Sequence, residues 1–131
     1  KKIAGKRTVD FNISHSGEFI LAVFAVGMDI GVDVQEMAEC PDYREIAENF
    51  YTAEEAEDVK NEGPDLFFQY WAAKEAYVKA LGIGLGRGMD FFSVRNGKIA
   101  EKDKKDQDWF LYPVRIKGYA AYVAAHKKGD R

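Results

Sequence analysis

One stretch, residues 67–88, constrains the fold of this chain more than any other; it reads FFQYWAAKEAYVKALGIGLGRG. Its large apolar residues recur at steps of three and four, which is the spacing of one face of an α-helix. These residues are Phe67, Tyr70, Trp71, Tyr77, Val78 and Leu81. Gly82 follows, and glycine is the usual residue just past a helix C-terminus. The pattern therefore predicts a core helix over residues 67–81.

Three charged residues of this helix lie at or near its apolar stripe. Glu75 and Lys79 are one turn apart at the edge of the stripe, on the boundary between core and solvent where a site can form. A Glu–Lys pair at this spacing is also an ordinary surface pair that contributes only about 0.2–0.5 kcal/mol. Lys74 falls inside the stripe, so its ammonium must either extend to solvent or meet an anion. The helix alone leaves both interpretations of Glu75 and Lys79 open.

Length and composition exclude several classes of protein. At 131 residues, 47% hydrophobic and 31% charged, the chain has the size and composition of a single globular domain. A net charge of −3 argues against a nucleic-acid partner, which would need a basic face. Cys40 is the only cysteine, so no intrachain disulfide forms. No apolar run reaches the roughly 18 residues that span a bilayer, and no signal peptide is recognisable, so we expect a cytoplasmic protein without a membrane partner.

Strand and helix patterns mix along the rest of the chain. Residues 11–13 read as a short strand that enters a polar turn at 14–17. Residues 19–26 and 30–35 read as strands that pair as a hairpin around the turn at 27–29. Two short helices are predicted at 42–49 and 52–60, and Thr52 with Glu55 makes a capping-box pattern at the start of the second. A loop at residues 61–65 precedes the central helix.

The last third of the chain reads as strands and turns. A strand is expected at 91–94, followed by a hairpin turn at Asn96-Gly97. Residues 101–108 form a charged loop, and two further strands are expected at 109–116 and 119–125. The elements do not alternate regularly between strand and helix. The predicted fold is therefore α+β, with a mostly antiparallel sheet packed against the long central helix.

The segment Ile30-Gly31-Val32-Asp33-Val34-Gln35 offers oxygen ligands for a metal. Alternate side chains of a strand share a face, so Asp33 and Gln35 should point together, away from the core-facing valines. Their carboxylate and amide oxygens, with Glu75, are ligands of the kind that Mg²⁺ prefers. An ordinary half-exposed strand with polar residues outside has the same pattern, and the spacing alone favours that reading.

Two further segments are candidates for binding anions. Ser14, His15 and Ser16 before Gly17 suit a phosphate, although a plain polar turn would look the same. A serine hydrolase is not indicated, because the Gly-x-Ser-x-Gly elbow is missing. The glycines of residues 82–88 follow a helix instead of a strand, which excludes a dinucleotide or P-loop fingerprint. We expect these glycines to form a backbone-rich loop beside the site, with Arg87 available to an acidic partner.

Together these stretches resemble the 4'-phosphopantetheinyl transferases, of the larger, surfactin-synthetase-activating type. The matching pieces, in order, are FNISHSG at 11–17, IGVDVQ at 30–35, FYTAEEAEDV at 50–59, WAAKEAYVKALGIGL at 71–85, DFFSV at 90–94 and YAAYVAA at 119–125. The order of the NISHSG, GVD and WxxKEAxxKxxGxGL motifs is specific to this family. The resemblance covers nearly the whole chain from Phe11 onward.

The resemblance implies a reaction and a set of roles. Members of the family transfer the phosphopantetheine arm of coenzyme A to a serine of an acyl or peptidyl carrier protein and release adenosine 3',5'-bisphosphate. By position, Asp33, Gln35 and Glu75 look like the Mg²⁺ ligands. Glu75 also resembles the general base, and Lys79 the lysine that stabilises the departing phosphate. The residues that match coenzyme A contacts are Ser14, His15, Ser16, Lys74 and Lys79.

Two departures from the family pattern matter. Many relatives carry Glu where this chain has Gln35, so Mg²⁺ should bind more weakly here. Relatives of this type also have two similar halves with the site between them, and we expect residues 1–29 to be the tail of the first half and residues 30–131 the second. A missing N-terminal half, or a homo-oligomer, would then complete the site. The alternatives are a catalytically incomplete half-domain that binds carrier protein or coenzyme A without turnover, and a Mg²⁺-dependent phosphohydrolase.

Overall fold

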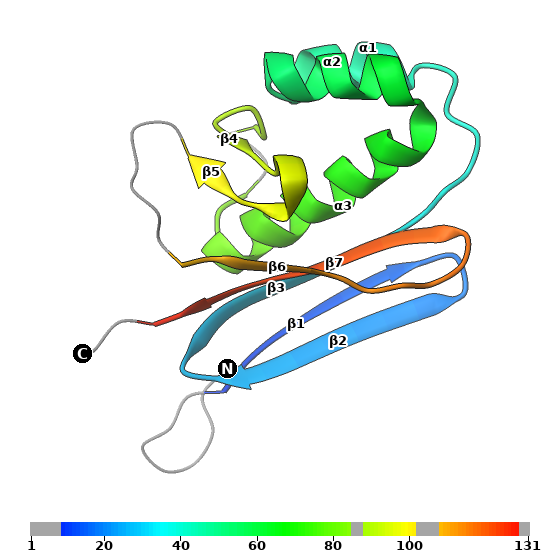
Figure 1. Ribbon diagram of the computed structural model, residues 1–131. Helices are drawn as coiled ribbons and strands as arrows, with labels where there is room; N and C mark the ends of the chain where they lie inside the picture. Colours follow the sequence, from blue (N-terminus) through cyan, green and yellow to red (C-terminus); the bar gives the residue numbers. More distant parts are fainter. Residues whose placement is uncertain (1–8, 85–87, 102–107, 129–131) are drawn as a thin grey trace.

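The computed structural model describes residues 9–84, 88–101 and 108–128. Figure 1 shows the helices on one side of the long strands and the N-terminal hairpin on the other. In chain order the elements are β1 (Val9–Ser16), β2 (Phe19–Val26), β3 (Met28–Glu36), α1 (Tyr43–Phe50), α2 (Ala53–Glu62), α3 (Pro64–Leu81), β4 (Phe92–Ser93), a 3₁₀ turn (Arg95–Gly97), β5 (Ala100–Glu101), β6 (Phe110–Pro113) and β7 (Tyr119–Lys127). Among the described residues, no helix is long and apolar enough to cross a membrane.

The main sheet has three antiparallel strands in the order β3-β7-β6, and α3 packs across β3 and β7. The register of β3 and β7 places Asp33 opposite Tyr122. Both faces of β7 are covered, because the adjacent pairs Ala120–Ala121 and Ala124–Ala125 point to opposite faces and all four alanines are buried. Small side chains on the sheet let the helix lie close to it. The predicted α+β fold, an antiparallel sheet against a long central helix, is confirmed.

The central helix ends where the sequence predicts and begins three residues earlier. Pro64 occupies its first turn, where a missing backbone N–H removes no helical hydrogen bond. Gly82 ends it in the left-handed conformation, with φ of 74°. Helix α2 begins with the predicted capping box, in which Thr52 and Glu55 each accept a hydrogen bond from the other's backbone N–H.

One strand pairing was predicted wrongly. Strand β2 pairs with β1, from Val9 opposite Val26 to Ser16 opposite Phe19, and β3 pairs with β7. The residues expected as a polar turn at 14–16 are therefore part of β1. Four consecutive residues of β3, from Gly31 to Val34, are buried, whereas alternate residues of β2 are exposed. A two-stranded hairpin would leave one face of β3 open to solvent. Both faces of β3 are buried, because the strand pairs with β7 and α3 packs across it.

The Asn96-Gly97 turn lies where the sequence predicts, between two strands of only two residues each. Asn96 and Gly97 both have positive φ, of 59° and 70°. They belong to the 3₁₀ turn that joins β4 to β5. Both conformations are the left-handed one that asparagine and glycine adopt most readily.

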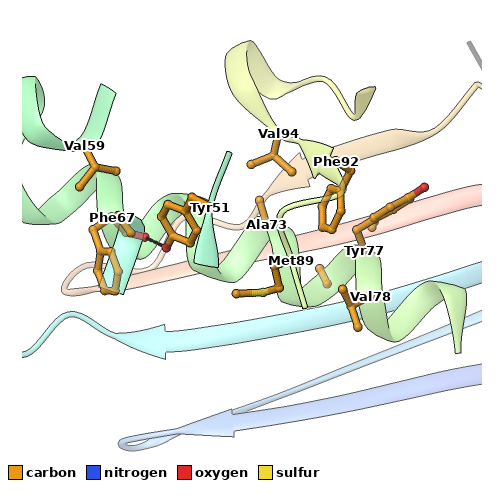
Figure 2. Packing of buried hydrophobic residues seen from close by; sticks show 12 residues of the cluster. Tyr51, Val59, Phe67, Ala73, Tyr77, Val78, Met89, Phe92 and Val94 are labelled. Atoms are coloured by element: carbon orange, nitrogen blue, oxygen red, sulfur yellow. Dashed lines mark hydrogen bonds between the residues drawn. The ribbon is translucent and has the colours of Figure 1, made fainter. Parts of the chain in front are cut away.

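The largest apolar cluster lies between α3, the two short helices and the segment around β4. Figure 2 shows its larger members, and the Tyr51 hydroxyl donates to the Phe67 carbonyl at 2.7 Å within it. Tyr77 packs against Phe92 with ring centroids 4.6 Å apart. The cluster packs on α3 from the short helices and the β4 segment and also includes Ala124 of β7, so both faces of the central helix are constrained.

Candidate functional site

Gly31 determines how closely β3 and α3 approach each other. A Cβ atom built at Gly31 would overlap the carbonyl oxygen of Ala76 and lie 2.6 Å from the backbone nitrogen of Ala80. Only glycine allows the two backbones to come so near. The close contact brings Asp33, two residues further along β3, to the face of α3 that carries Glu75 and Lys79.

Asp33 is a buried carboxylate that accepts hydrogen bonds from two neutral donors. It is 6% exposed; Ser14 Oγ donates to its Oδ1 at 3.3 Å and Gln35 Nε2 donates to its Oδ2 at 2.8 Å. The pKa of Asp33 is raised to about 6, mainly by burial and less by the nearby charge of Glu75, while the hydrogen bonds from Gln35 and Ser14 and the charge of Lys79 oppose the rise. A bound cation would strongly stabilise the ionised form of such a buried carboxylate.

Glu75 and Lys79 stand one turn apart on α3, as the sequence predicts. Burial raises the pKa of Glu75, and the charge of Lys79 opposes that rise. Lys79 Nζ donates to the carbonyl oxygens of Val32 at 2.8 Å and Ile13 at 3.0 Å. The ammonium therefore sits where β1, β3 and α3 meet, near both carboxylates.

Side chains of β1 bond to the backbone of β3. Asn12 Oδ1, Ser14 Oγ and Ser16 Oγ accept hydrogen bonds from the backbone nitrogens of Val32, Val34 and Glu36, at 2.9, 3.1 and 2.8 Å. The constant separation of twenty residues means that β1 runs parallel to β3. Side chains thus take the place of a neighbouring strand along the free edge of β3. The polar face of the hairpin is held against the site by these bonds.

The structure separates the three predicted residues of the Ser-His-Ser segment. Ser14 is buried and Ser16 partly buried, on the face of β1 that meets β3. His15 is exposed on the opposite face, next to Ile20. The hydroxyl of Ser14 orients Asp33, a role that the sequence did not suggest. The alternation of Asn12, Ser14 and Ser16 at every second residue was the signal that could have identified one polar strand face.

Lys74 meets an anion and does not extend to solvent, so the second of its two expected outcomes holds, but not at this site. Its side chain is fully buried; its Nζ pairs with Glu55 Oε1 at 2.7 Å and donates to the carbonyl oxygens of Met89 and Phe92. Glu55 also accepts from the backbone nitrogen of Val94 at 2.6 Å. The pair joins α2 and α3 to the segment around β4. We therefore withdraw Lys74 from the expected coenzyme A ligands, because its ammonium does not reach the surface.

The oxygen-bearing side chains around Asp33 are of the kind that bind a hard divalent cation. In the part of the chain that the structure describes, no three His, Cys, Asp or Glu side chains form a metal-binding group. The side chains that carry oxygen at this place include the carboxylates of Asp33 and Glu75 and the amide of Gln35, beside the Ser14 hydroxyl that bonds to Asp33. Gln35 now turns its nitrogen toward Asp33, and rotating the amide would present its oxygen instead. Oxygen ligands of this type suit Mg²⁺ with water completing its shell.

The glycine-rich loop after α3 is described only in part. Gly82, Ile83, Gly84 and Gly88 are described, and Arg87, expected to serve an acidic partner, lies outside the described residues. The end of this loop is held by Lys74 through the carbonyl oxygen of Met89. The buried ion pair thus anchors the segment that returns toward the core.

Comparison with known proteins supports the resemblance seen in the sequence. Residues 29–125 match the 4'-phosphopantetheinyl transferase superfamily. The chain is 38% identical over 89 residues to the 4'-phosphopantetheinyl transferase Sfp of Bacillus subtilis. The matched region covers 65% of this chain and 38% of that protein. It is 29% identical to the L-aminoadipate-semialdehyde dehydrogenase-phosphopantetheinyl transferase of Rattus norvegicus, over 92% of this chain and 47% of that protein. The chain thus spans less than half the length of these relatives.

A solved structure shares the fold. The holo-(acyl-carrier-protein) synthase of Bacillus anthracis, crystallised in complex with coenzyme A (3',5'-ADP), superimposes with a TM-score of 0.58 at 23% identity. The match covers 77% of this chain and 96% of the synthase chain. Because the family match covers most of the residues, including the strand with Asp33 and the helix with Glu75 and Lys79, this chain belongs to the 4'-phosphopantetheinyl transferase superfamily.

Proposed function

We propose that this chain transfers the 4'-phosphopantetheine arm of coenzyme A to a serine of an acyl or peptidyl carrier protein, with Mg²⁺ held by Asp33 and Glu75. One observation carries the proposal: two buried or half-buried carboxylates with raised pKa and one lysine meet between β3 and α3, in a chain of this superfamily. Transfer of a phosphoryl group needs mainly positioning and neutralisation of charge on the phosphate oxygens. The cytoplasmic location and the division of the chain at residue 30 stay predictions.

Glu75 and Lys79 have different roles in such a transfer. The serine oxygen of the acceptor attacks the phosphorus that bears the pantetheine arm, and the bond from that phosphorus to adenosine 3',5'-bisphosphate breaks. Glu75 accepts the serine proton; its raised pKa brings it closer to the working pH, where a general base is most effective. Lys79, positioned by two backbone carbonyls, supplies positive charge to the departing phosphate.

Mg²⁺ and the hairpin complete the proposed arrangement. Asp33 and Glu75 would hold the ion, with the amide oxygen of Gln35 as a weaker third ligand; when bound, the ion neutralises charge on the phosphate oxygens. Ser14 keeps Asp33 oriented toward the helix. Ser16 and His15 remain proposed contacts of the coenzyme A phosphates, on opposite faces of β1.

A second candidate function follows from the length of the chain. Because the chain spans 36–38% of several bacterial relatives, it would bind coenzyme A or carrier protein without turnover if the missing part supplies essential contacts. A Mg²⁺-dependent phosphohydrolase would share the carboxylates but would not need a carrier protein. Dependence on the acceptor separates this last possibility from a transferase.

The test is the intact mass of an apo carrier protein after incubation with this chain, coenzyme A and Mg²⁺. We expect a gain of one phosphopantetheine arm, absent with Glu75→Gln and retained with Glu57→Gln, which changes an exposed glutamate of α2 in the same way. Binding of coenzyme A by calorimetry is measured in parallel. No mass gain with retained binding would favour the incomplete half-domain, and neither gain nor binding would refute the proposal for this chain.

A further inference from the structure

A polar cavity lies on the side of α3 that points away from the candidate site. Four residues of this helix line it, Leu66, Gln69, Tyr70 and Ala73, at the three- and four-residue steps of one helix side. Glu75 follows Ala73 by two residues, about 200° around the helix, and so lies on the opposite side. The other walls come from α2, the 3₁₀ turn and the segment of β6 and β7, whose places around α3 can be followed in Figure 1.

One wall of the cavity is a network of hydrogen bonds around Asp58. Arg95 Nε and Nη2 donate to the two carboxylate oxygens of Asp58, at 2.7 and 3.1 Å. The Tyr70 hydroxyl donates to Oδ2 of the same carboxylate at 2.7 Å. These bonds join α2, α3 and the 3₁₀ turn, and Arg95 compensates the charge of Asp58. An anion in the cavity would therefore not meet an uncompensated carboxylate at Asp58.

Another wall carries an arginine that has no carboxylate partner. Arg115, between β6 and β7, forms no ion pair or side-chain hydrogen bond with any residue that the structure describes. It lies near Tyr122 of β7: burial raises the pKa of the Tyr122 hydroxyl, and the charge of Arg115 opposes that rise. Within the described ranges, this hydroxyl and the amide of Gln69 also lack a hydrogen-bond partner. Three groups that can donate hydrogen bonds thus line one cavity without an acceptor from the described chain.

These three groups determine the chemistry that the cavity accepts. A guanidinium binds phosphate or carboxylate through two parallel hydrogen bonds, and a hydroxyl and an amide supply further donors. Glu62, an exposed residue of α2, also lines the cavity and opposes an anion there. Its position at the exposed rim, where water screens charge, makes that opposition small beside a two-bond contact with Arg115.

The cavity is large enough for an organic molecule. Its volume is about 630 Å³, and small-molecule sites in proteins have volumes of about 300–1,000 Å³. Leu66, Val94 and Pro113 give the cavity an apolar part that an inorganic ion would leave unfilled. We propose that this cavity binds a small organic molecule through a phosphate or carboxylate group, held by Arg115 with the Tyr122 hydroxyl and the Gln69 amide.

The test is an NMR titration of the full 131-residue chain, isotope-labelled, with phenyl phosphate and with benzoate. We expect saturable shifts of the backbone amides of residues 94–97 and 115–122 with at least one of these anions. Benzamide, which has the same ring and no charge, should cause no saturable shift. The anion with the lower dissociation constant identifies the group, phosphate or carboxylate, that the cavity prefers.

Two matched variants assign the binding to Arg115. Arg115→Gln should raise the dissociation constant about tenfold or more, because charge-assisted hydrogen bonds are lost. Lys117→Gln removes another exposed cation of the same turn, one that does not line the cavity, and should change the constant by less than about twofold. Tyr122→Phe, which removes only the hydroxyl, should weaken binding severalfold. Glu62→Gln should strengthen binding, by up to about fivefold.

Three results would overturn the proposal. Absence of saturable shifts with both anions means that the cavity holds only water. An equal loss of binding in Arg115→Gln and Lys117→Gln means that general positive charge attracts the anion. Shifts that map to Ser14 and Lys79 place the anion at the candidate site instead. None of the residues that line the cavity takes part in the proposed transfer, so either proposal can fail without the other.

Discussion

Replacing Lys74 with methionine tests the energetics of the core most directly. Its ammonium and the carboxylate of Glu55 are both fully buried and 2.7 Å apart. The same ammonium donates to the carbonyl oxygens of Met89 and Phe92, at 2.7 and 2.5 Å. Methionine has a similar length and no charge, so Lys74→Met removes the cation and leaves the other groups in place. The Glu55 carboxylate would keep the backbone donors of Thr52 and Val94 but lose its buried counter-charge, and two carbonyl oxygens would lose their donor.

The expected cost of Lys74→Met is large for a chain of this size. Removing one partner of a buried ion pair destabilises a protein by about 3–5 kcal/mol, because the remaining charge is left uncompensated. A chain of 131 residues has a free energy of unfolding of about 7–20 kcal/mol. With a urea dependence of about 2 kcal/mol per molar, a loss of about 4 kcal/mol lowers the unfolding midpoint by roughly 2 M.

Urea unfolding followed by circular dichroism measures this cost. Lys60→Met removes an exposed lysine of α2 and should change the free energy of unfolding by less than about 0.5 kcal/mol. The double variant Glu55→Gln with Lys74→Met should recover part of the loss, because no buried charge remains. The reasoning is refuted if Lys74→Met and Lys60→Met shift the midpoint equally.

Three further predictions concern the site. Burial holds the pKa of Asp33 at about 6 in the folded chain, against 3.8 for an ordinary aspartate side chain, so the folded state binds more protons between these values and its stability falls as pH rises through them. Without metal, Asp33→Asn should therefore be more stable than the wild type at pH 7 by about 2–3 kcal/mol and lose this advantage near pH 4. Urea unfolding in EDTA at both pH values measures the difference in free energy of unfolding. The same difference at pH 7 and at pH 4 would contradict the prediction. Gly31→Ala should lower the free energy of unfolding by about 1–3 kcal/mol or more, because its Cβ would overlap the Ala76 carbonyl. Gly84→Ala, whose Cβ would meet no atom of the described residues within 4 Å, should leave the thermal midpoint unchanged. Gln35→Glu should lower the Mg²⁺ concentration needed for half-maximal transfer, and an unchanged Mg²⁺ dependence would count against Gln35 lying near the metal.

Local patterns account for the parts of the fold that were predicted correctly. The helix over residues 67–81, its stop at Gly82 and the capping box of Thr52 and Glu55 follow from periodicity and from single residues that act within one turn. The placement of Glu75 and Lys79 on one helix edge follows from the same geometry. Lys74 was expected either to extend to solvent or to meet an anion, and nothing local identified Glu55, nineteen positions earlier, as its partner.

The choice of strand partners could not be read from the chain. Residues 19–26 and 30–35 are neighbours with a glycine between them, yet β3 pairs with β7 from the other end of the chain. That pairing buries β3 under α3, a gain that depends on the alanines of a strand about ninety residues away. Closeness in the sequence does not identify such a partner, because β3 becomes buried only when α3 and β7 meet it in the folded state.

The sequence by itself determined the family, the central helix and the residue types of the site, because each of these depends on order and spacing along the chain. Only the tertiary structure decided which of those residues meet. It placed Ser14 against Asp33 and His15 on the outer face, although the two are adjacent in sequence. It also buried Lys74 in the core while Glu75, the next residue, faces the site. The physical reason is that neighbouring side chains of a strand point to opposite faces and those of a helix are turned by about 100°, so packing decides what each one contacts.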